Sequence, residues 1–193
     1  MNKKLALLLT AFITVVVIAT KAQENSVSVN YLNFGKGKGG DWDSGFGLQG
    51  KIQMKNNWYL IPDIGFSFTP REHNRYHLHY PTHGIYDVYK QRHHFFGNIN
   101  VAHFFQLRKR FWIAPLVGLG FYYRCEEMTL DGFVNDPIND NAGYYLLATN
   151  IGCLVEFNIS KHIFLTAGGK YMIDIYDGTD YIPYLNAGIG YKF

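Results

Sequence analysis

The sequence is poor in charge and in cysteine, and it lacks a long apolar run outside its first residues. Asp, Glu, Lys and Arg make up 17% of the 193 residues, below the roughly 25% of typical soluble domains. Two cysteines are too few for a disulfide framework or a four-thiolate zinc site. A hydrophobic content of 48% without a collagen or heptad repeat excludes disorder, collagen and coiled coil. What remains is one ordered domain with ample material for a core.

The first 22 residues have the pattern of a cleaved secretory signal peptide. Lys3 and Lys4 precede a charge-free apolar run over residues 5–19, and Thr20 and Ala22 are small residues at the −3 and −1 positions of a cut after Ala22. The alternative, a permanent signal anchor, requires a longer run of ~20 apolar residues. Cleavage lowers the basic count from 18 to 15, equal to the 15 acidic residues. The chain then has no basic excess, so we expect no nucleic-acid partner.

From residue 25 to the last residue, apolar and polar side chains alternate with a period of two, which predicts β-strands. Phe46, Leu48 and Ile52, for example, alternate with Gln49 and Lys51. No stretch has the 3.6-residue period of an amphipathic helix. The predicted domain covers residues 23–193, and its strands cover residues 27–31, 46–55, 58–68, 95–107, 111–123, 145–159, 163–174 and 181–193.

The connections between these segments alternate between short and long. Short turns follow residues 55, 107 and 159, whereas longer polar segments cover residues 35–44, 69–92, 124–141 and 175–180. This alternation is typical of an up-and-down barrel with short turns at one end and long loops at the other. Because the number of strands is even, both termini are expected on the short-turn side.

The distribution of side chains between the two faces predicts that the barrel is transmembrane. Alternate residues of a strand lie on the same face, and we call each such set a parity. The apolar parity carries large aromatic and aliphatic residues, whereas the other parity is rich in Gly, Asn, Gln and isolated charges. Strands of ~9–11 residues are long enough to cross a bilayer. Aromatic residues also gather at the strand ends, as expected for belts at the lipid headgroups. The predicted fold is an all-β, eight-stranded antiparallel up-and-down transmembrane β-barrel.

The C-terminus carries a family resemblance. Leu185, Ile189, Tyr191 and Phe193 alternate up to a terminal aromatic residue, which resembles the β-signal of bacterial outer-membrane proteins. Nearly all of residues 24–193 resembles the small eight-stranded barrels related to the OmpA transmembrane domain and to OmpX. The resemblance implies the outer membrane of a Gram-negative-type envelope, with outer-membrane lipid and the barrel assembly machinery as partners. Such barrels are adhesins, tethers, ligand binders and occasionally lipid-A enzymes, so it implies no single function.

The segment 69–92 is the predicted binding loop, with a possible extracellular ligand, because it is unusually rich in histidine. His73, His77, His79 and His83 lie in it. In an extended chain His77 and His79 share one face, and His83, Glu72 or Asp87 is the candidate to complete a metal site. The alternative is a solvated loop, since the spacing matches no strong zinc pattern.

Four charged residues, Lys51, Asp63, Glu156 and Lys170, share the inward parity of the predicted barrel. A charge in a narrow lumen needs a partner, so we expect these residues to form ion pairs. With a first turn centred on Asn57, Lys51 and Asp63 fall opposite each other. An eight-stranded barrel is only wide enough for its own side chains, which argues against a wide porin.

The sequence shows no cofactor motif and no catalytic motif. Serine is sparse, and no His motif lies beside it. We therefore expect a non-enzymatic barrel that binds a surface ligand or supports the envelope. The alternatives are a lipid-modifying enzyme of the outer leaflet and a soluble, exported lipocalin-like barrel with its large aromatic residues inside.

Overall fold

The computed structural model describes residues 25–35, 42–69, 72–78, 84–131, 138–176, 178 and 181–193, and its regular structure is β-strand. The predicted signal peptide lies outside the described residues. No helix among the described residues is long and apolar enough to cross a membrane. The ten strands are β1 (Ser26–Gly35), β2 (Trp42–Lys55), β3 (Trp58–Phe68), β4 (Glu72–Leu78), β5 (Gly84–His103), β6 (Phe105–Arg108), β7 (Phe111–Asp131), β8 (Ile138–Asn158), β9 (Ile163–Asp174) and β10 (Tyr181–Lys192).

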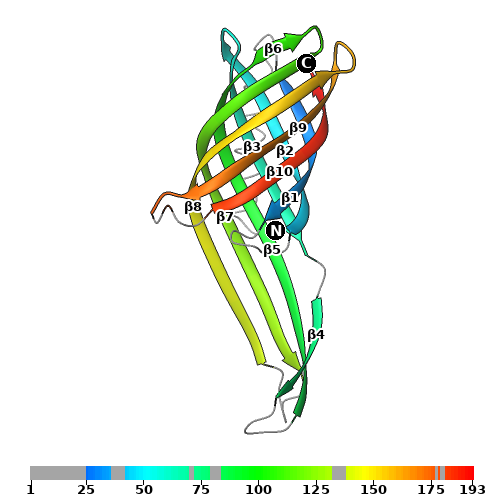
Figure 1. Ribbon diagram of the computed structural model, residues 1–193, viewed down its shortest axis with the longest axis vertical. Coiled ribbons are helices and arrows are strands. Elements are labelled where there is room, and N and C mark those ends of the chain that lie inside the picture. Colours follow the sequence, from blue (N-terminus) through cyan, green and yellow to red (C-terminus); the bar gives the residue numbers. More distant parts are fainter. Residues whose placement is uncertain are drawn as a thin grey trace.

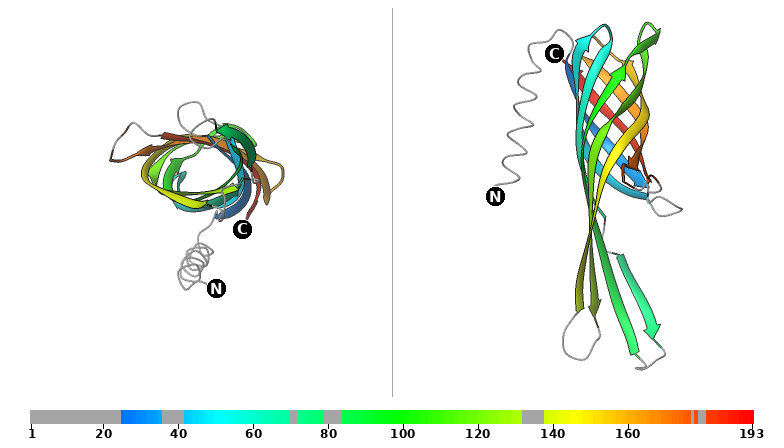
Figure 2. Two further views of the ribbon diagram at one scale, coloured as in Figure 1. Left: turned by 90° about the horizontal axis from the view of Figure 1, so that it is seen from below. Right: turned by 90° about the vertical axis from the view of Figure 1, so that its left-hand side faces the viewer.

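Eight of these strands close into an antiparallel barrel in the ring order β1-β2-β3-β5-β7-β8-β9-β10 (Figures 1 and 2). The ring closes where β1 pairs with β10, with Val29 opposite Ile189. The short β6 continues β5 along the same neighbour, since Ala102 opposes Leu116 and Phe105 opposes Ile113 on β7. Ser26 opposes Lys192, so both strand termini lie at the short-turn end. The predicted eight-stranded up-and-down barrel is therefore confirmed.

The turn between β2 and β3 shows how the sequence sets a short connection. Asn56 and Asn57 have φ angles of 48° and 64°. Two successive residues with positive φ form the tight hairpin turn whose twist matches that of the flanking strands, and Asn tolerates this conformation well. A register shift between Gln53 and Lys55 accompanies the turn.

The outer surface of the barrel is apolar, as predicted for a barrel in lipid. Ile99, Leu119 and Ile189 are 62%, 63% and 54% exposed, although they lie in the middle of strands. Exposed aromatic residues stand toward both ends, including Trp58 at the short-turn end and Tyr145 at the other. A soluble lipocalin-like barrel would place these side chains inside, so the structure contradicts that alternative.

The interior contains more aromatic side chains than the sequence pattern indicated. Phe34, Phe96, Tyr122 and Tyr184 point inward and are at most 4% exposed. They belong to one of two buried apolar clusters that fill the narrow lumen. Glycine gives the polar side chains between them room, since a methyl group at Gly120 would overlap an Asn98 side-chain oxygen.

Two of the predicted loops are largely strands, which corrects the prediction for residues 69–92 and 124–141. Beyond the barrel rim, β4 pairs with β5, β5 pairs with β7, and β7 pairs with β8. We call this four-stranded extension, in the order β4-β5-β7-β8, the projecting sheet; it extends well past the other strands in Figures 1 and 2. The sequence hides these strands because both of their faces lie outside the lipid, so polar and apolar residues do not alternate cleanly.

Candidate functional site

The lumen is built from alternating polar and apolar layers. The inward residues of β8 show this order from the short-turn end, with Glu156, then Leu154, then Asn150, then Ala148 and Leu146. Phe104, which follows β5, and the inward residues of β5 repeat the order: the apolar Phe104 and Ala102 come first, then the polar Asn100 and Asn98, followed by Phe96, His94 and Arg92. Three polar layers and two apolar clusters thus occupy the barrel interior.

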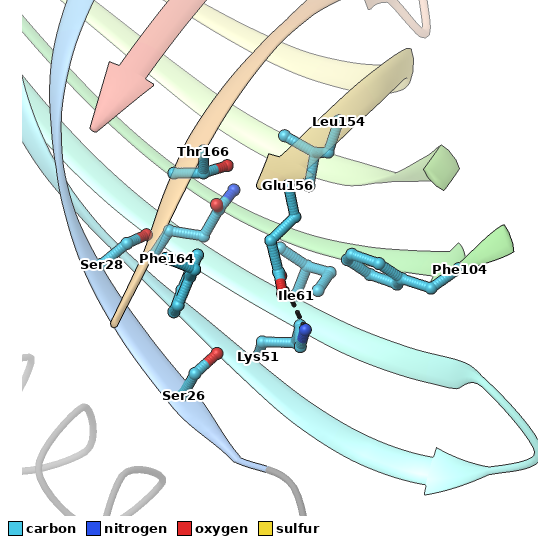
Figure 3. A pocket seen from close by; sticks show the side chains of 10 residues that line it. Ser26, Ser28, Lys51, Ile61, Phe104, Leu154, Glu156, Phe164 and Thr166 are labelled. Carbon is cyan, nitrogen blue, oxygen red and sulfur yellow. Dashed lines mark hydrogen bonds and ion pairs between the residues drawn. The ribbon is translucent and has the colours of Figure 1, made fainter. Parts of the chain in front are cut away.

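The first polar layer surrounds Glu156 near the short-turn end (Figure 3). Its Oε2 lies 2.7 Å from Lys51 Nζ and its Oε1 lies 2.5 Å from Lys192 Nζ. Lys51 also lies over the rings of Phe104 and Tyr59, at 4.3 and 4.8 Å from their centroids. The cavity beside this layer has a volume of about 10 Å³, which is room for about one water molecule. The layer is therefore a closed plug.

The second polar layer surrounds Asp63 in the middle of the barrel. Lys170 Nζ lies 2.7 Å from Asp63 Oδ2, and both side chains are at most 4% exposed. Asn98 and Asn100 donate to the two carboxylate oxygens at 2.5 and 3.4 Å, and Asn150 donates to both of these asparagines. An ion pair this deeply buried is stable only when such hydrogen bonds satisfy its remaining lone pairs.

The predicted position of Lys51 opposite Asp63 was wrong, although the structure pairs all four charged residues, as expected. Lys51 does not face Asp63, because Gln49 is the residue opposite Asp63 in the β2–β3 ladder. The turn at Asn56 and Asn57 is centred half a residue earlier than assumed, and the bulge between Gln53 and Lys55 brings the shift of the ladder centre to one residue. The observed pairs, Lys51 with Glu156 and Lys170 with Asp63, cross the lumen between strands far apart in the sequence.

The third polar layer, at the rim below the projecting sheet, was not predicted. His94 Nε2 lies 2.7 Å from Asp43 Oδ2, and His94 Nδ1 lies 2.5 Å from the Tyr122 hydroxyl. Arg92 Nη2 lies 3.4 Å from the other oxygen of Asp43. The alternation of residues does place Asp43 and His94 on the inward face, but the predicted strands began only at residues 46 and 95, so both residues lay just outside them.

This acid–histidine–hydroxyl arrangement resembles a catalytic triad in composition but not in accessibility. Asp43, His94 and Tyr122 are each 3% exposed, and both ring nitrogens of His94 already have partners. Ser67 opposes His94 in the β3–β5 ladder, but its hydroxyl donates to the Ser44 carbonyl oxygen. The arrangement therefore ties β2, β5 and β7 together, with no nitrogen left to activate a substrate.

The histidine-rich segment belongs to the projecting sheet. His73 and His77 lie in β4, whereas His79 and His83 lie outside the described residues. The structure brings no group of three or more His, Cys, Asp or Glu side chains together as a metal site within the residues it describes. A zinc or copper site at His77, His79 and His83 stays a prediction that calorimetry on the folded protein tests.

The base of the projecting sheet is charged and balanced. Lys90 Nζ lies 3.9 Å and Arg124 Nη2 3.3 Å from Glu126 carboxylate oxygens. His93 Nε2 lies 4.0 Å from a Glu127 carboxylate oxygen on the outward side. On the outward face, the rim therefore carries His93 and Glu127, whereas the outward residues nearer the short turns are apolar; such a change is expected where lipid meets water.

The predicted assembly signal lies on the outward face of the last strand. Leu185, Ile189, Tyr191 and Phe193 are between 49% and 58% exposed, in β10 and at its end. The rings of Tyr191 and Phe193 pack edge to face with centroids 5.8 Å apart. These side chains are available to a partner on the lipid side, and recognition by an assembly machinery stays a prediction.

Comparison with solved structures identifies the fold. The chain is similar to the attachment invasion locus protein Ail of Yersinia pestis, with a TM-score of 0.55, 17% identity, and coverage of 88% of this chain and 98% of that one. It is similar to a major outer membrane protein of Thermus thermophilus, with a TM-score of 0.59, 11% identity, and coverage of 89% and 100%. It is also similar to OprG of Pseudomonas aeruginosa, with a TM-score of 0.56, 9% identity, and coverage of 89% and 96%.

Ail has also been solved in complex with the heparin analogue sucrose octasulfate. No protein-family model and no curated protein matches this chain. At these identities the likeness shows the fold, which is the closed eight-stranded barrel of small outer-membrane proteins.

Proposed function

We propose that this chain is a small outer-membrane barrel whose projecting sheet binds a partner outside the cell. The projecting sheet itself carries the proposal. It continues past the end of the apolar outer band. No described strand pairs with the edge of β4 that faces away from β5, or with the edge of residues 138–146 of β8 that faces away from β7. Export through residues 1–22 and assembly through the C-terminal residues complete the proposal.

Two free strand edges give the projecting sheet a physical means of recognition. An unpaired edge presents a row of backbone N–H and C=O groups that an extended segment of another protein can pair with. The described charges at the base of the sheet compensate one another, since the two cations Lys90 and Arg124 stand against the two carboxylates of Glu126 and the neighbouring Glu127. The Ail complex shows a sulfated ligand on a barrel of this fold. Here balanced charge favours a polypeptide over a polyanion.

The interior supports a binding role over transport or catalysis. The layers around Glu156, Asp63 and His94 fill the lumen with paired polar groups and apolar clusters. A wide aqueous path needs a larger barrel than eight strands provide. The one acid–histidine–hydroxyl set that the described residues form by hydrogen bonds is sealed from both lipid and water.

The first test is the orientation of the barrel in living cells. Glu127→Cys marks the projecting sheet and Ser160→Cys marks the short-turn end; both positions are exposed. Each variant is made in a Cys125→Ser/Cys153→Ser background and treated with a membrane-impermeant maleimide. We expect the Glu127→Cys variant to react in intact cells and the Ser160→Cys variant only after permeabilisation. The reverse pattern would contradict the proposal.

The second test is binding by the projecting sheet. His73 and Tyr89 are opposed in the β4–β5 ladder, so residues 74–88 can be replaced by a two-residue Asn-Gly turn without opening the barrel. Cells carrying the full or the shortened protein are panned against a displayed library of unstructured peptides. We expect peptide enrichment on the full protein alone. Equal enrichment on both, or on neither, would contradict the binding role and favour structural support of the envelope.

A further inference from the structure

A cluster of positive charge lies at the short-turn end, opposite the projecting sheet. Lys109 and Arg110 connect β6 to β7, and Lys161 lies in the turn between β8 and β9. These turns are neighbours because the Asn158 backbone N–H donates to the Arg110 carbonyl oxygen at 2.8 Å. All three cationic residues are exposed.

A fourth cation completes the cluster from the last strand. The Lys192 backbone N–H donates to the His162 carbonyl oxygen at 2.8 Å, which sets β10 beside the same turn. A cavity of about 390 Å³ lies between these elements, lined by Lys109, Arg110, Lys161 and Lys192 together with Asn158 and Ile159. Its volume falls within the ~300–1,000 Å³ of small-molecule sites.

Lys192 is paired with Glu156, but the positive charges of Lys109, Arg110 and Lys161 are not compensated by described residues. Glu156 is the nearby carboxylate, but it is 3% exposed and held by Lys51 and Lys192. No ion pair joins Lys109, Arg110 or Lys161 to another residue within the described segments. At the opposite rim, by contrast, Lys90 and Arg124 share Glu126.

The cavity also borders the lipid-facing surface. Ile159 lines the cavity and is 45% exposed, and Leu107 and Ile163 beside the same turns are 58% and 40% exposed. A ligand at this site meets cations on one side and apolar side chains on the other. A free inorganic anion would contact only the cations, whereas an anionic phospholipid has a headgroup that contacts the cations and acyl chains that contact the apolar side chains.

We propose that this cluster, which we call the basic turn site, binds the phosphate headgroup of an anionic phospholipid in the leaflet at the short-turn end. Lys109, Arg110 and Lys161 supply charge-assisted hydrogen bonds to phosphate oxygens, while the acyl chains lie along the apolar border. The inference rests on the proposed membrane location, but it does not depend on binding by the projecting sheet. It assigns the two ends of the barrel different partners.

The experiment measures lipid binding to the folded protein in a neutral detergent by native mass spectrometry. The probes are phosphatidylglycerol, phosphatidylcholine and inorganic phosphate, compared at physiological ionic strength. The test variant is Lys109→Gln/Arg110→Gln, and the control is Lys90→Gln/Arg124→Gln, which removes the same charge at the other rim. A gel shift between unheated and boiled samples reports that each protein is a folded barrel.

We expect phosphatidylglycerol to bind more tightly than phosphatidylcholine. The test variant should weaken phosphatidylglycerol binding about tenfold, the loss of two charge-assisted contacts, while the control changes it less than about twofold. Equal loss in both variants, or equal binding of both lipids by a heat-shifting barrel, would overturn the inference and leave the proposed function standing. Displacement of the lipid by equimolar inorganic phosphate would assign the site to a free anion. A water-soluble protein without a heat shift would overturn both proposals.

Discussion

Removing the buried lysine of the central layer tests whether the lumen is dry and closed. Lys170→Met deletes the ammonium 2.7 Å from Asp63 Oδ2 and leaves a carboxylate whose side chain is 4% exposed. Breaking a buried pair on one side costs about 3–5 kcal/mol. Because Asn98 and Asn100 still donate to Asp63, we expect the lower end of this range, about 3 kcal/mol.

A matched control distinguishes burial from charge alone. Lys192→Met also removes a lysine from a carboxylate, but Glu156 keeps Lys51 at 2.7 Å, and the Lys192 side chain is 23% exposed. This change should cost about 1 kcal/mol or less. The assay is urea unfolding in detergent micelles, followed by tryptophan fluorescence and by the fraction of heat-shifting band on a gel.

The single variant Asp63→Asn and the double variant Asp63→Asn/Lys170→Met complete the double-mutant cycle. Neutralising both partners removes the unpaired charge, so the coupling energy should be about 2 kcal/mol or more. Losses below about 1 kcal/mol for Lys170→Met would refute the reasoning, because they would mean that water reaches Asp63 and screens it.

Three further predictions concern the packing of the barrel strands, the outward face of the barrel and the filled lumen. Gly188→Ala places a methyl group 2.2 Å from the Val29 carbonyl oxygen and should lower the free energy of unfolding by about 1–3 kcal/mol in the same assay. For Gly97→Ala, whose methyl group has its nearest neighbour at 3.9 Å, the free energy of unfolding should change by less than about 0.5 kcal/mol. Ile99→Arg on the middle of the outward face should cost about 2–4 kcal/mol in lipid, whereas Gln91→Arg beyond the rim should be neutral; equal costs would place Ile99 in water. Planar-bilayer recordings should show no steady open channel, because side chains fill the lumen; a stable ohmic conductance would contradict the plug.

The alternation of side chains was sufficient to predict the barrel, because every strand of a closed sheet in lipid must have an apolar outward face. It was sufficient to assign Leu119 to the outside and Glu156 to the inside, as the structure confirms. It did not predict the projecting sheet, since beyond the rim both faces meet water and the parity signal disappears.

The alternation did not predict which side chains pair across the lumen, because this pairing depends on strand register and on barrel shear. Lys170 meets Asp63 at a separation of 107 residues, and Lys51 meets Glu156 at a separation of 105. A shift of one residue at the turn after Lys55 changes which side chains oppose each other, and the sequence does not reveal the bulge that causes it. The rim layer around His94 was missed for another reason, since the strands that carry Asp43 and His94 were predicted to begin a few residues too late.

The central claim, a closed barrel with its apolar face in the outer membrane, is tested most directly by gel migration of fractionated cells. Membranes from a Gram-negative host expressing the chain are run unheated and boiled. We expect the protein in the outer-membrane fraction, as a band that migrates faster unheated and shifts on boiling. A band in the soluble periplasmic fraction with no shift would contradict the account, because the exposed face that includes Ile99 and Leu119 would then have to be covered by something other than lipid.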